Sequence, residues 1–546
     1  MRAAGGHRWR RWCSRVAFLL PACGAVVAAT ALPASAHAVL EHSYPAAEAV
    51  LRARPVVVDL TFDETVLAAS DALHVYDDHL QPVATSVTTH PGGRGDEIAA
   101  DLPADLAAGT YTVTWRVTSA DTHVVSGSFE FSIGHRTTVS GGPPTVQQDS
   151  VTLAASGLMR GLGYIGLVAG PGALIVALWL WPAGLARRRV RRVLSGGGLL
   201  VAVATLLGFA VQGALAAGVP LSRALTSSAL HLGVDGRFGR AGLDRLALLV
   251  VLAELAVMYR ERLRQLRMFA SVTGVALAAT WSYAGHAGTG SLVPLTFIAD
   301  LVHVSAMATW LGGLLLLCTG VLPQAGEDAH AVVSRFSEWA LAAVTLIVAT
   351  GVFASWRNVR HWGALTGTSY GVILLIKICV VAVAIGIAMI SRRLAARPLA
   401  TDQSIGRLRR TVVAEAGFAV VVLGLTAALT GKAQAYEVYA PPFTQSATDG
   451  GIVVTVHLDR TTVGTAQLVV STRRVDGGVQ QISQITGTLT ELDPPIGPLQ
   501  IRFRSAGPGR EIATVSFPDQ GSWQVLLDVR TSAIDEIEVA ATVPIR

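Results

Sequence analysis

The chain has 546 residues, of which 51% are hydrophobic and only 15% are charged. This composition is too apolar for an ordinary soluble enzyme and is typical of a membrane protein. The formal net charge is +6, but residues 37–150 contain fifteen Asp and Glu, five Arg and no Lys, which gives that block a net charge of −10. An acidic surface attracts cations, so nucleic acid is not expected as a partner.

The first 36 residues have the three parts of a secretory signal peptide: a basic start, an apolar stretch and the small residues Ala34-Ser35-Ala36. Cleavage after Ala36 would make His37 the first residue of the mature protein. An uncleaved membrane anchor is one alternative. Lipoprotein processing at Cys23 is another, but the apolar run continues past Cys23, which argues against it.

Residues 56–134 consist of short segments of alternating polar and apolar residues, separated by Pro, Gly and Asp. This pattern predicts a small all-β sandwich or barrel, within a domain of residues 37–138. Residues 139–150 are rich in Pro, Gly, Ser and Gln, so we expect them to link this domain to the membrane.

Eight apolar segments follow, and most reach the roughly 20 residues that a helix needs to cross a bilayer. They predict an eight-helix transmembrane bundle over residues 151–432. The third segment is short and contains Glu254, which makes it the weakest of the set. The segments cover residues 152–182, 194–217, 243–258, 268–285, 293–322, 338–356, 371–390 and 411–431.

Basic residues concentrate in three alternate loops, at 187–192, 259–267 and 391–410. Because positive loops face the cytoplasm, this pattern places both terminal domains outside the cell. Arg223, Arg237 and Arg240 depart from it, since they fall in a loop on the outer side.

Residues 440–546 again alternate as β-strands do, and they contain a single histidine, His457, with no Cys or Met. We interpret this block as a structural or docking β-sandwich with little to offer a metal. The predicted fold class is therefore a multidomain membrane protein with an N-terminal all-β sandwich or barrel, an eight-helix transmembrane bundle and a C-terminal all-β sandwich.

Three residues of the N-terminal block form a candidate metal site. A terminal His37 offers an α-amine and an imidazole nitrogen to one ion. Asp121 and His123 are two apart, so on a strand they would share a face. Nitrogen and oxygen ligands suit Cu(II), although exposed histidines without a ligand role are also common.

Within the membrane block, ionisable residues are costly and mark candidate functional positions. His286 lies at the outer end of the fourth segment. In the fifth, Asp300, His303 and Met307 follow a helical spacing that places them on one face. They indicate either a path for a metal ion or a polar contact between helices.

The stretches HAVLEHSYPAAEAVL and VTSADTHVVSGSFEFSIG resemble the CopC family of copper-binding domains. In that family the terminal His, the Asp and the downstream His bind Cu(II), which implies that role for His37, Asp121 and His123. Some members also have a Met-rich Cu(I) site, but residues 37–150 contain no Met, so this domain departs from that pattern.

The stretches WSYAGHAGTG and DLVHVSAMATWLGGLLLL resemble the CopD family of copper-resistance membrane proteins. Further similarity lies at residues 236–249, 334–344, 349–356 and 371–380 and at Glu415. The resemblance implies copper passage through the membrane block, with His286 and His303 as the main candidates. Supporting positions are Asp300, Met307, Trp310, Lys377 and Glu415.

The whole chain therefore resembles a CopC and CopD fusion that captures Cu(II) outside the plasma membrane and passes copper, as Cu(I) if it is reduced, inward through the bilayer. No GxxxxGK[ST] motif is present, so ATP is not expected to drive transfer directly. We predict a binding protein rather than an enzyme. The alternatives are copper sequestration for resistance and a copper- or haem-dependent redox enzyme.

Overall fold

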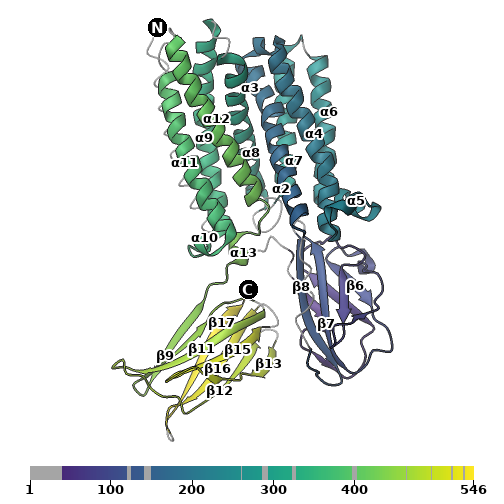
Figure 1. Cartoon of the computed structure of the whole chain (residues 1–546), viewed down its shortest axis with the longest axis vertical. Coiled ribbons are helices and arrows are strands. Elements are labelled where there is room, and N and C mark those ends of the chain that lie inside the picture. The colour runs from purple at the N-terminus through teal and green to yellow at the C-terminus, as the bar shows by residue number, and fades with distance from the viewer. Residues whose placement is uncertain are drawn as a thin grey trace. The chain divides into compact units, whose positions relative to one another are not determined.

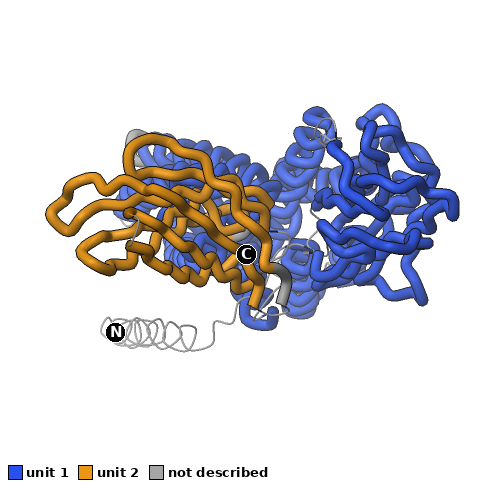
Figure 2. Tube along the Cα trace, turned by 90° about the horizontal axis from the view of Figure 1, so that it is seen from below, with its two compact units in different colours: residues 1–435 blue, residues 436–546 orange. Residues whose placement is uncertain are grey.

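The computed structural model describes most of the chain (Figure 1). The described residues are 38, 40–119, 124–139, 149–259, 261–285, 293–322, 327–395, 402–462, 464–492, 495–517, 521–532 and 535–545. The predicted signal peptide and the predicted site residues His37, Asp121, His123 and His286 lie outside these ranges. The chain forms two compact units, residues 1–435 and 436–546, which are described separately (Figure 2).

The N-terminal region is built from two β-sheets that share one hydrophobic core. Along β3, Val58, Leu60 and Phe62 are buried while the residues between them are partly exposed, as the alternating sequence requires. The Phe62 ring packs edge to face on Trp115 of β7, with centroids 5.1 Å apart. The predicted N-terminal β region is therefore confirmed.

The strand order is β1-β3-β6 in one sheet and β2-β8-β7-β4-β5 in the other. The strands are β1 (Leu40–Tyr44), β2 (Val50–Leu51), β3 (Val57–Phe62), β4 (Leu73–Tyr76), β5 (Pro82–Val83), β6 (Glu97–Asp101), β7 (Gly109–Thr118) and β8 (Val124–Ile133).

The helical region begins at Ser150, where the Asp149 side chain accepts a hydrogen bond from the Thr152 backbone N–H at 3.0 Å and caps the first helix. Glycines let its helices approach closely: a Cβ on Gly197 would overlap the backbone of Gly170, and one on Gly312 would overlap Ala173. Small residues at such crossings are typical of helices that pack within membranes.

The first helices are α2 (Ser150–Leu167), a π-helical turn (Val168–Gly172), α3 (Ala173–Leu180), α4 (Arg188–Ala217), α5 (Ser227–Val234), α6 (Gly236–Met258) and α7 (Leu263–Ala284). The remaining helices are α8 (Val293–Leu316), a π-helical turn (Leu317–Val321), α9 (Glu327–Val359), α10 (Ala364–Gly367), α11 (Ser369–Ala395), α12 (Asp402–Leu429) and α13 (Ala435–Val438). Short 3-10 turns lie at Pro91–Gly93, Pro182–Ala186 and Leu221–Arg223.

Six helical segments of the described chain are long and apolar enough to cross a membrane, so the predicted count of eight is not confirmed. The third and fourth predicted segments do form helices, α6 and α7, but these fall outside the six. Charged residues lower the hydropathy of α6, which carries Arg237, Arg240, Asp244, Arg245 and Glu254. The helix α7 has charged residues only near its start, and its Ser, Thr, Trp and Tyr residues also lower its hydropathy. The six segments are Ser150–Leu180, Arg188–Ala217, Val293–Val321, Ala329–Val359, Ser369–Ala395 and Gly406–Leu429.

The C-terminal unit contains two antiparallel sheets around a core that includes the fully buried Trp523. In β17 every second residue is buried along the whole strand, which is the pattern of a sheet with one face on a core. This β region was predicted from the sequence. Its strands are β9 (Phe443–Asp449), β10 (Ile452–Leu458), β11 (Gly464–Arg474), β12 (Gln484–Leu492), β13 (Pro495–Gln500), β14 (Arg504–Ser505), β15 (Arg510–Phe517), β16 (Gly521–Arg530) and β17 (Glu536–Ile545).

Candidate functional site

The candidate Cu(II) residues His37, Asp121 and His123 lie outside the described residues, so their arrangement stays a prediction. The structure does describe what flanks them. Ala38, the residue after His37, is buried in the core of the N-terminal region at 3% exposure. Thr118 at the end of β7 pairs with Val124 at the start of β8, so two paired strands border residues 119–123.

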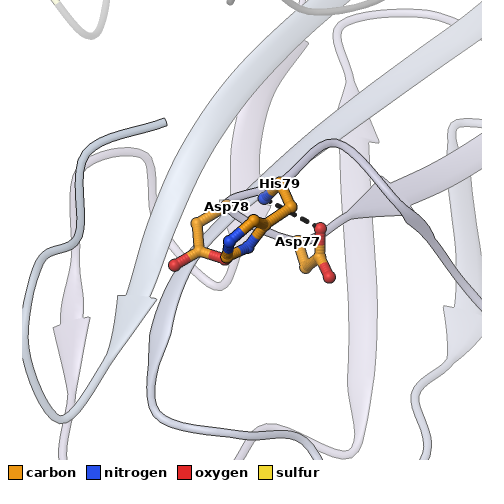
Figure 3. Close-up of side chains that lie close together, drawn as sticks. All are labelled: Asp77, Asp78 and His79. Carbon is orange, nitrogen blue, oxygen red and sulfur yellow. Dashed lines mark hydrogen bonds and ion pairs between the residues drawn. The ribbon is translucent and has the colours of Figure 1, made fainter. Parts of the chain in front are cut away.

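A group that sequence reasoning did not single out lies at the turn after β4, where Asp77, Asp78 and His79 place possible metal ligand atoms close together (Figure 3). One Asp77 carboxylate oxygen accepts hydrogen bonds from the backbone N–H groups of His79 and Gln81, at 2.9 and 2.8 Å. The exposed His79 ring lies 2.6 Å from the Asp78 carboxylate. The side chains of this cluster therefore bond within the turn itself and face solvent, which explains their closeness without a metal ion.

His303 has the most informative geometry among the described membrane residues. Its Nδ1 lies 2.8 Å from the hydroxyl oxygen of Thr350 on α9. That hydroxyl donates its own proton to the Leu346 carbonyl at 2.6 Å, so it accepts a hydrogen bond from Nδ1–H. A neutral imidazole that carries its proton on Nδ1 keeps the Nε2 lone pair free for a metal.

Asp300, His303 and Met307 all line one cavity of about 1020 Å³. A carboxylate, an imidazole and a thioether therefore border the same space, although they are spread over two turns of α8. Lys377 of α11 lines the cavity too and lies close enough to both Asp300 and His303 to interact electrostatically.

Glu415 lies apart from this set. It is 3% exposed and borders a smaller cavity of about 100 Å³, together with Ser391. Trp310, Val344 and Ile385 line both cavities, whereas Glu415 borders only the smaller one and His303 only the larger one. The structure therefore does not bring all the predicted membrane residues into one site.

Sequence reasoning missed many other residues of the large cavity, among them Arg160, Tyr164, Arg245 and Trp281. Arg245 is 7% exposed, and its guanidinium lies over the Trp281 ring, 3.7 Å from the centroid. A signal was available in the sequence, because both arginines interrupt apolar segments, where charged residues are costly.

Three family models match the chain. A CopC domain matches residues 40–134, a Copper resistance protein D-like N-terminal domain matches residues 151–293, and Copper resistance protein D matches residues 330–429. These matches cover the N-terminal β region and most of the helical region.

Among curated proteins, the chain is 26% identical to the copper transport protein CutJ of Bacillus subtilis, over 93% of this chain and 95% of that protein. It is 34% identical to protein YobA of Escherichia coli K12, over 18% of this chain and 79% of YobA. It is 30% identical to copper resistance protein C of Escherichia coli, over 20% of this chain and 91% of that protein.

Solved structures also match about a fifth of the chain. CopC from Methylosinus trichosporium OB3b is 31% identical, with 18% of this chain and 93% of that chain covered and a TM-score of 0.17. PcoC, a methionine-rich copper resistance protein from Escherichia coli, is 28% identical, with 18% and 98% covered and a TM-score of 0.16.

These matches run along the chain in the order CopC domain, CopD-like N-terminal domain and CopD domain, and a copper transport protein matches nearly its whole length. The six apolar helices lie within or next to the CopD matches, so this part is a multi-pass membrane domain. The chain therefore belongs to the CopC and CopD copper-resistance family, as a fusion of the two domains.

Proposed function

We propose that this protein captures Cu(II) outside the cell and passes copper through its membrane domain into the cytoplasm. In this proposal residues 37–138 form the capture domain, which binds Cu(II) through His37, Asp121 and His123. Residues 151–432 form the membrane domain. The CopC and CopD matches in one chain support this division, as does the net charge of −10 in the block of residues 37–150.

The observation that carries the proposal is the cavity around His303. The hydrogen bond to Thr350 orients the imidazole so that Nε2 is available, and Met307 lies one turn further along the same helix. An imidazole suits both oxidation states of copper, and a thioether favours Cu(I). We include His286 in the path as a residue outside the described part, and Glu415 as a supporting residue nearer the other cavity.

The proposed arrangement across the membrane rests on the basic loops. With the three arginine-rich loops on the cytoplasmic side of the plasma membrane, both β regions would lie outside. A linker at residues 139–150 would hold the capture domain above the membrane at an effective concentration on the order of millimolar. The partners are then copper and the lipid bilayer, and the role is binding and transfer rather than catalysis.

Copper accumulation in cells that express the full chain tests this proposal. We expect His303→Ala to lower the rate of accumulation by roughly tenfold, because it removes the nitrogen ligand in the cavity. His330→Ala is the matched control, since His330 is an exposed histidine on α9 that does not line the cavity. Membrane levels of both variants must equal those of the wild type.

Equal accumulation by the wild type and His303→Ala would contradict import and would favour sequestration by a membrane-anchored capture domain. Absorbance near the haem Soret band in the purified protein would instead support a redox enzyme.

A further inference from the structure

The wall of the large cavity carries more positive than negative side chains. Its described lining includes the guanidinium groups of Arg160, Arg245, Arg357 and Arg360 and the ammonium group of Lys377, but a single carboxylate, Asp300. Lys377 and Asp300 lie close enough to interact electrostatically. Arginines therefore outnumber carboxylates at this wall.

Arg160 and Arg245 meet at Tyr164, which lies within electrostatic reach of both. Arg245 donates from Nε to the Thr280 hydroxyl at 3.1 Å and from Nη2 to the Thr280 carbonyl at 3.4 Å, and it stacks on Trp281. The Nε of Arg160 is buried and has no hydrogen-bond partner among the described residues. The Asp300 carboxylate also lies within electrostatic reach of Tyr164, but the hydrogen-bond and ring partners that the structure gives Arg245 are neutral.

Buried charges are costly unless they are paired and hydrogen-bonded. Neutral partners accept hydrogen bonds from the guanidinium N–H groups but do not cancel the positive charge of these groups. An anion in the adjoining space would do both, and a cavity of about 1020 Å³ has ample room for one. Guanidinium groups match the geometry of carboxylate and phosphate oxygens, to which they donate two parallel hydrogen bonds.

We propose that the membrane cavity binds an oxyanion, a carboxylate or phosphate group, between Arg160 and Arg245. The group comes either from a small free acid or from the headgroup of an anionic lipid, and the chemistry of recognition is the same for both. This site does not depend on copper transfer. Where copper does enter the cavity, the bound anion lowers the positive charge that the metal meets near His303.

The test uses the full-length protein, free of copper, purified in a neutral detergent and stripped of anionic lipid. Thermal unfolding is followed while inorganic phosphate, succinate or phosphatidylglycerol is added, with nitrate at equal ionic strength as the reference. We expect a saturable rise in unfolding temperature. Saturation by phosphate or succinate identifies a free acid as the source, whereas saturation by phosphatidylglycerol alone identifies a lipid headgroup.

Arg160→Gln should weaken the apparent affinity by roughly tenfold or more, because it removes a charge-assisted pair of hydrogen bonds. Arg160→Lys keeps the positive charge but loses the planar guanidinium group. Its apparent affinity for the anion should therefore lie between those of the wild type and Arg160→Gln. Arg264→Gln, at an exposed arginine of α7 outside the cavity, should bind as the wild type does. Arg245→Gln is the companion variant, and Arg160→Gln keeps the test valid if Arg245→Gln does not fold.

No saturable shift with any of the three anions would overturn the proposal. So would a shift that keeps its full affinity in Arg160→Gln. Because these measurements contain no copper, they can fail while copper accumulation still depends on His303, and the two proposals are separately testable.

Discussion

The N-terminal block and the membrane cavity differ in the sign of their charge. Residues 37–150 carry a net charge of −10, whereas the described cavity wall has four arginines and Lys377 but only one carboxylate, Asp300. An acidic surface raises the local concentration of every cation. A basic cavity opposes cations, because two like charges 4 Å apart repel by about 4 kcal/mol at an effective dielectric constant of 20.

Under the proposed function, collection and passage of copper place different demands on one chain. The N-terminal domain would need affinity for a hydrated divalent ion, which carboxylate, amine and imidazole ligands provide. The cavity instead needs to admit copper without becoming a general cation pore. An excess of arginine that one bound oxyanion offsets only in part, with one imidazole and one thioether on α8, would satisfy that second demand.

The largest effect is expected at the first residue of the capture domain. One Ala inserted between Ala36 and His37, with signal cleavage unchanged, separates the terminal amine from the imidazole. We expect Cu(II) affinity of the full-length protein to fall by roughly a hundredfold or more, since one chelating ligand is lost and the other displaced. Titration of the wild type and the insertion variant with Cu(II) at constant pH measures the two affinities.

His79→Ala is the control for this insertion, because the His79 side chain is exposed and its ring contacts only a turn. Unchanged affinity after the insertion would show that the amine is not a ligand. The titration needs mass spectrometry of the mature protein as a companion measurement, because a first residue other than His37 would remove the basis of the prediction.

A smaller effect is expected in the cavity, where Thr350 positions His303 rather than touching copper. Thr350→Val keeps the size of the side chain but removes the oxygen that accepts from Nδ1–H. Loss of such a partner typically lowers metal affinity by about tenfold. Copper accumulation should fall accordingly, and the pH dependence of accumulation should shift because the imidazole tautomer is no longer fixed.

Thr345→Val provides a matched control, since Thr345 is exposed on the same helix and donates to the Leu341 carbonyl in the same way. Equal losses in both variants would mean that the helix, not the orientation of His303, had been disturbed.

The regular elements of this chain were predictable because each has a local signal. The two β regions show alternation with a period of two, and the strict alternation of β17 is the clearest case. The helices follow from long apolar runs. The number of spans was less predictable, because α6 and α7 mix polar or charged residues with apolar ones, and hydropathy alone does not decide where such a helix lies.

The cavity was only partly predictable. The spacing of Asp300, His303 and Met307 on one helix gave their common face, and they do line one space. The partners Thr350, Arg160 and Arg245 belong to other helices, and which helix faces meet depends on close packing at glycines such as Gly197. No pattern within a single segment carries that information.

The smallest effect is expected at Asp78, in the acidic N-terminal region. Hydrogen bonds from Thr137 and then His79 hold the pKa of the Asp78 carboxyl below its usual value. A carboxyl whose pKa is lower in the folded state stabilises the fold above its unfolded pKa, and this contribution is lost as the pH falls through the folded value. Asp78→Asn should therefore be slightly less stable than the wild type near neutral pH.

The difference between the two proteins should shrink in acid, at pH values below about 4, where the wild-type carboxyl also becomes neutral. Denaturant unfolding of the full-length wild type and Asp78→Asn at several pH values measures this difference in stability. A difference that stays constant into acid would mean that Asp78 acts through shape rather than charge. The negative charge of Asp78 would then help to attract cations but would not stabilise the fold. The difference in charge between the N-terminal block and the cavity wall would in that case affect ion binding and not folding.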